Sequence, residues 1–323
     1  MSHSSDPDSP TGPSRRGWLG ATAGAAAAAL ASPAFSQPQE HRDGHAVAAP
    51  FHLRYAPHFG MFRHLAGDDL VAQLEFAAGQ GFRAWEDNSM AGRPVEEQAR
   101  LATVMQRLGI SMGVFVANFG TAFGKKSFAS GSPDMLESFL ADMRKAVEVA
   151  KRVDAKWCTI VLGDMDPGLA PEFQAANAIE MLKRGAEVCE PHGLVMVMEP
   201  LNPWHDHPGM FLQRIPQAFM LCKAVASPSC KILFDIYHQQ ITEGNLIPNI
   251  DRAWDEIGYF QIGDNPGRNE PGTGEIAYGN VFRYLHRKGW RGLLGMEHGN
   301  SLPGKEGEEA VLAAYRQADD FAP

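Results

Sequence analysis

Four short apolar runs in the second half of the chain end at or beside a residue with a carboxylate or amide side chain. The clearest reads G-L-V-M-V-M-E-P-L-N over residues 193–202, where an unbroken apolar run leads to Glu199. Such a run is typical of a strand buried on both faces. The pattern recurs three times downstream, at Asp235, Gln261 and Glu297. Side chains at the tips of consecutive parallel strands converge at one edge, so these four are candidates for a shared site.

Carboxylates gathered in this way need a positive partner. A structural role, either an ion pair with an Arg or a place at a helix N-terminus, explains one buried Glu as well as a functional role does. Three carboxylates packed together repel one another and take up protons unless a cation lies between them. A divalent metal therefore accounts for the set most simply, although Gln261 alone would more often be a buried amide. Because all the donors are oxygens, the set favours Mg²⁺ or Mn²⁺ over zinc.

Groups that carry or can carry positive charge lie close by in the sequence. His238 follows Asp235 by three residues, an offset that brings it back over the strand tips, and Arg268 lies in the loop after the seventh apolar run. Beside a metal, they could hold a carboxylate, keto or hydroxyl oxygen of a small polyoxygenated substrate. His205 and His207 follow the fifth run and could serve the same purpose, or could be solvated or capping residues.

A barrel would bring these residues together. From residue 51, apolar runs alternate with amphipathic stretches, and the expected strands cover residues 51–56, 82–86, 110–116, 157–162, 194–198, 230–235, 258–262 and 292–297. Strict alternation indicates parallel pairing, and eight units in one chain favour a closed α/β (β/α)8 TIM barrel. An open doubly wound sheet would have a Gly-rich phosphate fingerprint after the first strand, which P-H-F-G-M-F does not supply.

The stretches between the expected strands predict the helices. They cover residues 68–79, 94–108, 132–153, 171–192, 216–225, 278–288 and 306–318, and residues 236–255 are expected to be partly helical. Gly109 is the expected helix stop and Ser132 an expected N-cap. Residues 118–131, rich in Gly, Ser and Lys, are expected to form a loop long enough to act as a lid.

The first 36 residues have the features of an export signal. Ser14 begins S-R-R-G-W-L, an Ala-rich run follows over residues 21–31, and small residues close the segment near Ser36. This order is typical of a twin-arginine signal peptide, although a chance Arg pair before an Ala-rich linker is the alternative. The apolar run is too short to be a convincing spanning helix. We therefore expect cleavage near Ser36, a flexible lead-in over residues 37–50, a catalytic domain over residues 51–323 and a periplasmic location.

Composition narrows the class of protein further. The chain has 323 residues and a formal net charge of −9, which argues against a nucleic-acid-binding surface. The cysteines form no C-x-x-C pair and no zinc spacing, so we expect buried thiols rather than a disulfide: Cys158, Cys189, Cys222 and Cys230.

Several motifs carry a resemblance to a known family. M-E-P-L-N (198–202), F-D-I-Y-H-Q-Q (234–240), Q-I-G-D-N-P-G-R-N-E-P-G-T-G-E-I (261–276) and G-M-E-H (295–298) resemble the hydroxypyruvate isomerase branch of the xylose isomerase-like barrels. The resemblance is strong over about residues 190–300 and collinear from residue 51. It implies one divalent metal bound by Glu199, Asp235, Gln261 and Glu297. It also implies that the two glutamates move a proton between neighbouring carbons and that His238 and Arg268 bind substrate.

The resemblance implies a metal-dependent aldose–ketose isomerase acting through an enediolate on hydroxypyruvate or a related short keto acid or sugar. A ketose 3-epimerase or a keto-polyol dehydratase on the same scaffold remains open, as does an exported sugar-binding protein without catalysis. The expected partner is a small-molecule substrate, with no nucleic acid and no stable membrane insertion after leader cleavage. A homo-oligomer is the expectation of the family.

Overall fold

A ring of parallel strands forms the centre of the computed structural model, which describes residues 48–321. The strands are β1 (Arg54–Ala56), β2 (Ala84–Trp85), β3 (Ser111–Met112), β4 (Trp157–Ile160), β5 (Val195–Met198), β6 (Cys230–Asp235), β7 (Ile257–Gln261) and β8 (Leu293–Gly295). Six of them pair in the order β1-β8-β7-β6-β5-β4, and β2 pairs with β3. Isolated parallel bridges from His58 to Glu86 and from Val116 to Thr159 join the two sheets. The predicted eight-stranded TIM barrel is therefore confirmed.

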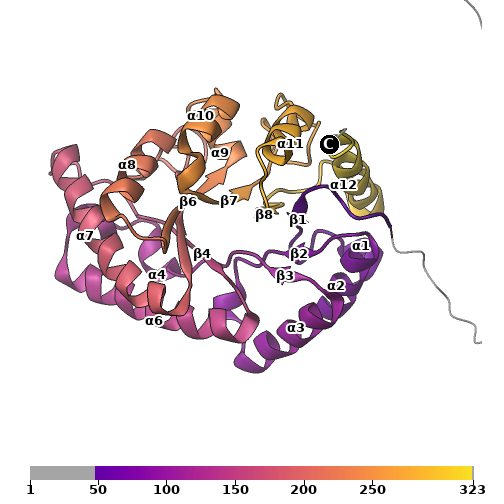
Figure 1. The fold of residues 1–323 in the computed structure, drawn as a ribbon, viewed down its shortest axis with the longest axis horizontal. Helices are drawn as coiled ribbons and strands as arrows, with labels where there is room; N and C mark the ends of the chain where they lie inside the picture. The colour runs from indigo at the N-terminus through magenta and orange to yellow at the C-terminus, as the bar shows by residue number, and fades with distance from the viewer. Residues whose placement is uncertain (1–47, 322–323) are drawn as a thin grey trace, which may run out of the picture. The chain divides into compact units, whose positions relative to one another are not determined.

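Helices carry the chain from each strand to the next. They are α1 (Arg63–Ala66), α2 (Leu70–Gly79), α3 (Val95–Leu108), α4 (Phe119–Ala122), α5 (Ser127–Ser130), α6 (Pro133–Val153), α7 (Pro171–Cys189), α8 (Ile215–Val225), α9 (Ile236–Thr242), α10 (Leu246–Ala253), α11 (Tyr278–Arg287) and α12 (Gly304–Ala318). Figure 1 shows the long helices following one another around the outside of the strands. Every helix expected from the sequence is present, with boundaries within a few residues of those expected.

Local signals explain most of the helix ends. Asp69 caps α2 by accepting a hydrogen bond from the backbone N–H of Ala72. Gly109 ends α3 in the left-handed conformation, with φ of 66°, as expected. Ser132 occupies the N-cap position of α6, as expected, although its side chain makes no capping hydrogen bond.

The interior of the barrel and the layer outside it are separate apolar clusters. Apolar side chains from seven of the strand regions, most of them small or medium in size, fill the interior: Ala56, Ala84, Val114, Val197, Leu233, Tyr259 and Leu293. Alternate residues on the same strands face outward and pack against the helices in a much larger cluster. The barrel is thus a filled core, and chemistry is confined to its ends.

The segment expected to be a lid is in part a packed element. Residues 118–131 contain α4 and α5, and Ser127, Phe128 and Ala129 of α5 are buried. The Ser127 hydroxyl donates to the carbonyl oxygen of Leu162 at 3.0 Å. The prediction of a loop over the whole of residues 118–131 is therefore wrong, and α5 packs against the end of β4.

The leader and most of the lead-in lie outside the described residues. Of the lead-in, Ala48 donates a backbone hydrogen bond to Gly79, and Ala49 accepts one from Arg316. Among the described helices, none combines the length and the apolar character needed to cross a bilayer. The four cysteines are all buried and free, as expected.

Candidate active site

The four oxygen-bearing residues expected at the strand tips lie at one end of the barrel. Glu199 directly follows β5, Asp235 and Gln261 are the last residues of β6 and β7, and Glu297 comes two residues after β8. Asp235 is the register partner of Gln261, which is in turn the partner of Gly295. The carboxyl ends of the strands thus form one mouth, the usual place for chemistry in this fold.

Glu199, Asp235 and His238 form a buried cluster at that mouth. Each offers one potential ligand atom within 4.8 Å of those of the other two. Burial, followed by the negative charges of Glu297 and Asp235, raises the pKa of Glu199 well above its usual value. Burial also raises the pKa of Asp235, against the opposing effect of Arg268. These carboxylates therefore gain strongly from a cation placed among them.

Arg268 supplies part of that positive charge. Its Nη2 donates to Asp235 Oδ2 at 3.1 Å and to Glu297 Oε2 at 2.7 Å. The guanidinium also lies 4.8 Å over the ring of Tyr237. Burial lowers the pKa of Arg268, but Glu297 and Asp235 more than reverse that effect and raise it. The ion pair with an Arg, considered above as an alternative, thus holds for Asp235 and Glu297.

The proton on His238 is placed by Asn202. The backbone N–H groups of His205 and Asp206 donate to Asn202 Oδ1 at 3.0 and 3.2 Å, so Nδ2 is the donor end of this amide. Asn202 Nδ2 donates to His238 Nδ1 at 2.7 Å. Burial, followed by the charge of Arg268, lowers the pKa of His238 to about 3, so the ring is neutral. The proton is therefore on Nε2.

The protonated nitrogen of His238 faces the carboxylates. Nε2 lies 3.7 Å from Glu199 Oε1 and 3.5 Å from Asp235 Oδ2. Asp235 itself places the ring, because its Oδ1 accepts from the backbone N–H groups of Tyr237 and His238 at the start of α9. Although His238 falls within ligand distance of the cluster, a nitrogen that carries its proton is a hydrogen-bond donor and does not bind a metal.

Gln261 presents an unpaired oxygen. Its Nε2 donates to Glu86 Oε1 at 2.8 Å, while its Oε1 is buried without a hydrogen-bond partner among the described residues. Leaving a buried carbonyl oxygen unpaired costs about 1–3 kcal/mol. A hard cation between Gln261 and the carboxylates would satisfy this oxygen, so the donor set fits Mg²⁺ or Mn²⁺.

Three residues of the site were missed in the sequence. Glu86 directly follows β2 and is 2% exposed, and burial followed by repulsion from Glu297 raises its pKa well above the usual value. Asn88 Nδ2 donates to Glu297 Oε1 at 2.6 Å, and Asn202 holds His238. The run F-R-A-W-E also ends in a carboxylate, so the rule that identified Glu199 would have found Glu86 if applied to the first half of the chain.

The two remaining histidines have different positions. The His205 side chain is 74% exposed and pairs with Asp206 at 2.9 Å. The ring of His207 lies 5.4 Å from that of His238 and stacks on Phe123 at 5.5 Å. Of the two, only His207 is at the site.

Two cavities open at the mouth. One of about 260 Å³ has Glu86, Asn88 and Glu297 in its lining, and one of about 590 Å³ is lined in part by Tyr237 and Arg268. The first has room for a molecule of a few heavy atoms beside Glu297. Most of the side chains that line the second are polar.

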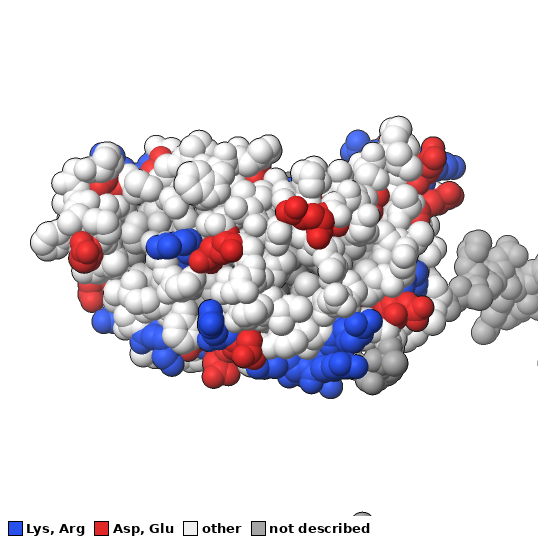
Figure 2. All heavy atoms as spheres, turned by 90° about the horizontal axis from the view of Figure 1, so that it is seen from above, with Lys and Arg blue, Asp and Glu red and all other residues white. Residues whose placement is uncertain are grey.

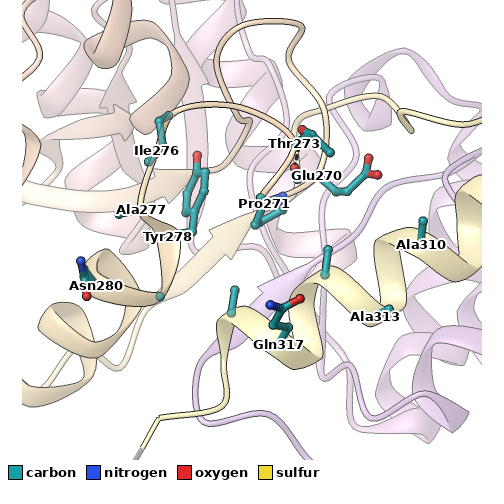
Figure 3. Close-up of a pocket in the computed structure, with 14 residues that line it drawn as sticks. Glu270, Pro271, Thr273, Ile276, Ala277, Tyr278, Asn280, Ala310, Ala313 and Gln317 are labelled. Carbon is teal, nitrogen blue, oxygen red and sulfur yellow. Dashed lines mark hydrogen bonds between the residues drawn. The ribbon is translucent and has the colours of Figure 1, made fainter.

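A further cavity of about 610 Å³ lies between the loop that contains Glu270 and α12 (Figure 3). Ala310 and Ala313 of α12 face it. The carboxylate of Glu270 is already bound to the backbone N–H and the hydroxyl of Ser301. This cavity therefore offers no free carboxylate for proton transfer.

Charges of both signs are spread over the face shown in Figure 2. There, Lys and Arg side chains lie near Asp and Glu side chains, and uncharged atoms cover most of the surface. Lys and Arg side chains gather at the lower right of this view, and Asp and Glu side chains lie between the other basic groups along the lower edge.

Comparisons with known proteins agree on one family. Residues 74–318 match the family model described as "Xylose isomerase-like TIM barrel". The chain is 31% identical over 247 residues to hydroxypyruvate isomerase of Escherichia coli, covering 76% of this chain and 93% of the relative. It is 30% identical over 224 residues to 2-oxo-tetronate isomerase of Cupriavidus necator, covering 69% and 84%.

Solved structures agree on the fold. A family 2 AP endonuclease of Brucella melitensis superposes with a TM-score of 0.68 at 22% identity, covering 84% of this chain and 100% of that one. The IOLI protein, solved with a bound zinc atom, superposes with a TM-score of 0.67 at 17% identity, with the same coverage.

Proposed function

The chain belongs to the xylose isomerase-like TIM barrel family, and from this premise we propose that it is a metal-dependent aldose–ketose isomerase. The proposed substrate is hydroxypyruvate or a related short keto acid or sugar. The observation that carries the proposal is the convergence of Glu199 and Glu297 with Asp235 and the unpaired oxygen of Gln261 at one mouth. Such a site combines two candidate proton-transfer groups with a place for a cation.

The substrate class rests on the relatives and on the size of the cavity. The relatives at 30–31% identity are named for hydroxypyruvate and 2-oxo-tetronate, both short keto acids. The cavity beside Glu297 is about 260 Å³, which suits a small ligand. Arg268 provides a guanidinium that can pair with a carboxylate or a keto oxygen.

The metal would be held by Glu199, Asp235, Gln261 and Glu297, and we propose Mg²⁺ or Mn²⁺. When bound, such a cation would polarise a substrate carbonyl and so acidify the neighbouring C–H. His238 is outside the ligand set, because its Nε2 carries the proton. That N–H is instead available to a substrate oxygen.

The protein's own part in the reaction is proton transfer. One of Glu199 and Glu297, as a carboxylate, removes the proton next to the carbonyl, and the other, as a carboxylic acid, gives a proton to the former carbonyl carbon. The substrate hydroxyl proton passes to the former carbonyl oxygen, and the two glutamates regain their starting forms by proton exchange with solvent. Asn88 and Arg268 each donate to one oxygen of Glu297, which fixes the orientation of its carboxylate. A substrate bound at this mouth would develop negative charge as an enediolate forms, and the Arg268 guanidinium and the Nε2–H of His238 are available to stabilise that charge.

A product assay tests this function. Protein from residue 37 onward is stripped of metal, reloaded with Mn²⁺ and incubated with hydroxypyruvate and a panel of ketoses. We expect an isomer of unchanged mass, tartronate semialdehyde from hydroxypyruvate, formed only with metal. A product lighter by one water would indicate a dehydratase, and a ketose inverted at one carbon an epimerase. Binding without any conversion would indicate a binding protein, and each of these three outcomes would contradict the proposal.

We also propose that the protein is exported by the twin-arginine route to the periplasm. The support is the S-R-R-G-W-L motif that begins at Ser14 and the Ala-rich run after it. Changing Arg15 and Arg16 together to Lys should leave the full chain in the cytoplasmic fraction of expressing cells, while the unchanged chain reaches the periplasm. Equal periplasmic amounts of both would contradict this route.

A further inference from the structure

We infer that Glu86 is a positioning residue that holds the side-chain amide of Gln261 so that its oxygen, and not its NH₂ group, faces the metal site. The inference rests on the proposed metal site and adds a residue outside the proposed set of metal ligands. It explains why an amide at this position acts as a ligand.

The contacts of Glu86 determine the orientation of the amide. Gln261 Nε2 donates to Glu86 Oε1 at 2.8 Å, and the Tyr259 hydroxyl donates to Glu86 Oε2 at 3.0 Å. Tyr259 and Gln261 lie two residues apart on β7, so both side chains point to the same face of the strand. Each oxygen of Glu86 is thus used as an acceptor from β7.

A carboxylate selects one end of an amide. In its ionised form, which the hydrogen bonds from Gln261 and Tyr259 favour, Glu86 accepts hydrogen bonds from NH₂ and repels a carbonyl oxygen. Without Glu86, the acidic cluster on the other side of Gln261 would attract the NH₂ group, because Asp235 is its register partner. With Glu86 holding Nε2, Oε1 points away from Glu86, and among the described residues it has no hydrogen-bond partner.

The strands around this pair leave room for it. A Cβ at Gly295 of β8 would overlap Glu86 Oε2, and a Cβ at Gly113, just after β3, would overlap the Tyr259 hydroxyl. The Cβ added at Gly295 would also lie 3.2 Å from Gln261 Cγ. Two glycines on two strands thus leave the space that the carboxylate and the phenol occupy.

The affinity of the purified protein for Mn²⁺, followed by the EPR signal of free Mn²⁺, tests the inference without relying on activity. In Glu86→Gln, the amide at position 86 can either accept from or donate to the Gln261 amide, so Gln261 is no longer held in one orientation. We expect Mn²⁺ to bind at least about 10-fold more weakly. In Glu86→Gln/Gln261→Glu the amide and the carboxylate exchange places. The new amide donates to the new carboxylate, whose second oxygen faces the metal, and affinity should return to within about 3-fold of wild type.

A control variant separates the contact to Gln261 from the other contact of Glu86, and a second variant covers the case in which Glu86→Gln does not fold. Tyr259→Phe removes the other donor to Glu86 but leaves the bond to Gln261, so its affinity should stay within about 3-fold of wild type. Metal-free melting curves establish that each variant is folded. If Glu86→Gln does not fold, Glu86→Asp replaces it, because it keeps the charge but falls short of Gln261, and the same loss is expected.

Two results would overturn the inference. One is a folded Glu86 variant that binds Mn²⁺ as tightly as wild type, and the other is an exchange variant that binds no better than Glu86→Gln. Both would leave the proposed metal site intact. Failure of the wild-type protein to bind Mn²⁺ would instead overturn the metal site, and the inference with it.

Discussion

At the scale of single residues, the site depends on groups that fix where protons lie. Asn202 is the clearest case, because two backbone N–H groups orient its amide before the amide orients His238. The pattern M-E-P-L-N shows that Asn202 is near the site. It does not show the contact to His238, which lies 36 residues further along the chain.

Asn202→Asp should reverse the tautomer of His238. An aspartate can only accept, so Nδ1 would carry the proton and Nε2 would expose its lone pair to the metal site. We expect the ¹⁵N shifts of the two ring nitrogens to exchange, turnover to fall about 10-fold or more, and the preference for Zn²⁺ over Mn²⁺ to rise.

The matched control is Asp206→Asn, since Asp206 also accepts from Asn202. Alone it should leave the tautomer unchanged, and combined with Asn202→Asp it removes the repulsion that the new carboxylate creates. An Nε2–H signal that persists in Asn202→Asp would show that Asn202 does not set the tautomer.

The sequence identified some site residues because their role depends on one strand alone. Glu199, Asp235 and Glu297 each follow an apolar run, and a residue at a strand tip can be recognised without its neighbours. Glu86 follows the same rule, but it lies at the tip of the second strand, outside the four consecutive strands from which the site was predicted. The orientation of the Gln261 amide depends on Glu86, which is 175 residues away in the sequence. No local sequence pattern contains this contact.

At the scale of elements, β8 must carry no side chain at Gly295, because the Glu86 side chain occupies the space beside it. Gly295→Ala should push Glu86 out of its place, because the added Cβ would overlap Glu86 Oε2. We expect a loss of about 1–3 kcal/mol in unfolding free energy and weaker Mn²⁺ binding, measured by urea unfolding and by Mn²⁺ titration. Gly289→Ala is the control. Gly289 has a φ of 86° and open space around it, so an alanine there should lower stability without changing Mn²⁺ affinity. Unchanged Mn²⁺ affinity in Gly295→Ala would contradict the assigned packing.

The segment after β8 should make stability sensitive to pH through His298. Burial lowers the pKa of His298 to about 3, and its ring bonds to Gly299 and to the Tyr315 hydroxyl. In the unfolded chain the ring takes up a proton below about pH 6.5, whereas in the folded protein it does not until about pH 3. Stability is therefore lost as pH falls through this window.

From pH 7 to pH 5 this one residue should cost about 2 kcal/mol. Other groups titrate as well, so urea unfolding of metal-free wild type is compared with that of His298→Gln, which keeps one donor and one acceptor. The wild type should lose about 2 kcal/mol more than the variant over this range. Parallel losses in both proteins would show that His298 is not the cause.

The segment 118–131 shows where element prediction failed. Helices of four residues, such as α4 and α5, are too short to show a 3.6-residue repeat. The Gly, Ser and Lys residues of this segment indicate an exposed loop. Ser127 is nevertheless buried, and its hydroxyl is satisfied by the carbonyl oxygen of Leu162. A long-range contact therefore overrode the local signal.

At the scale of the whole molecule, the alternation of strands and helices was sufficient to predict the barrel. The ring closes only weakly at β2 and β3. These two strands are two residues long each, and single bridges join the pair to the six-stranded sheet on either side. The strand tips at the mouth could be predicted for the same reason that the barrel could. In a parallel barrel every strand ends on the same face.

Metal should stabilise the whole domain by relieving repulsion at the mouth. At a concentration of Mn²⁺ about 100 times its Kd, the gain is about 2.7 kcal/mol, or about 5–10 °C in melting temperature. Removing metal with EDTA should reverse this shift in wild type but change little in Asp235→Asn, which lacks a ligand charge. Equal melting temperatures with and without metal would argue against a metal at this site.

The most direct test of the central claim, metal-dependent proton transfer by Glu199 and Glu297, is deuterium uptake. Mn²⁺-loaded protein is incubated in D₂O with the substrate that the product assay identifies, and NMR follows exchange at the carbon beside the carbonyl. Exchange should occur in wild type, stop without metal and slow at least about 100-fold in both Glu199→Gln and Glu297→Gln. Exchange within 10-fold of wild type in either variant, or full exchange without metal, would contradict the account.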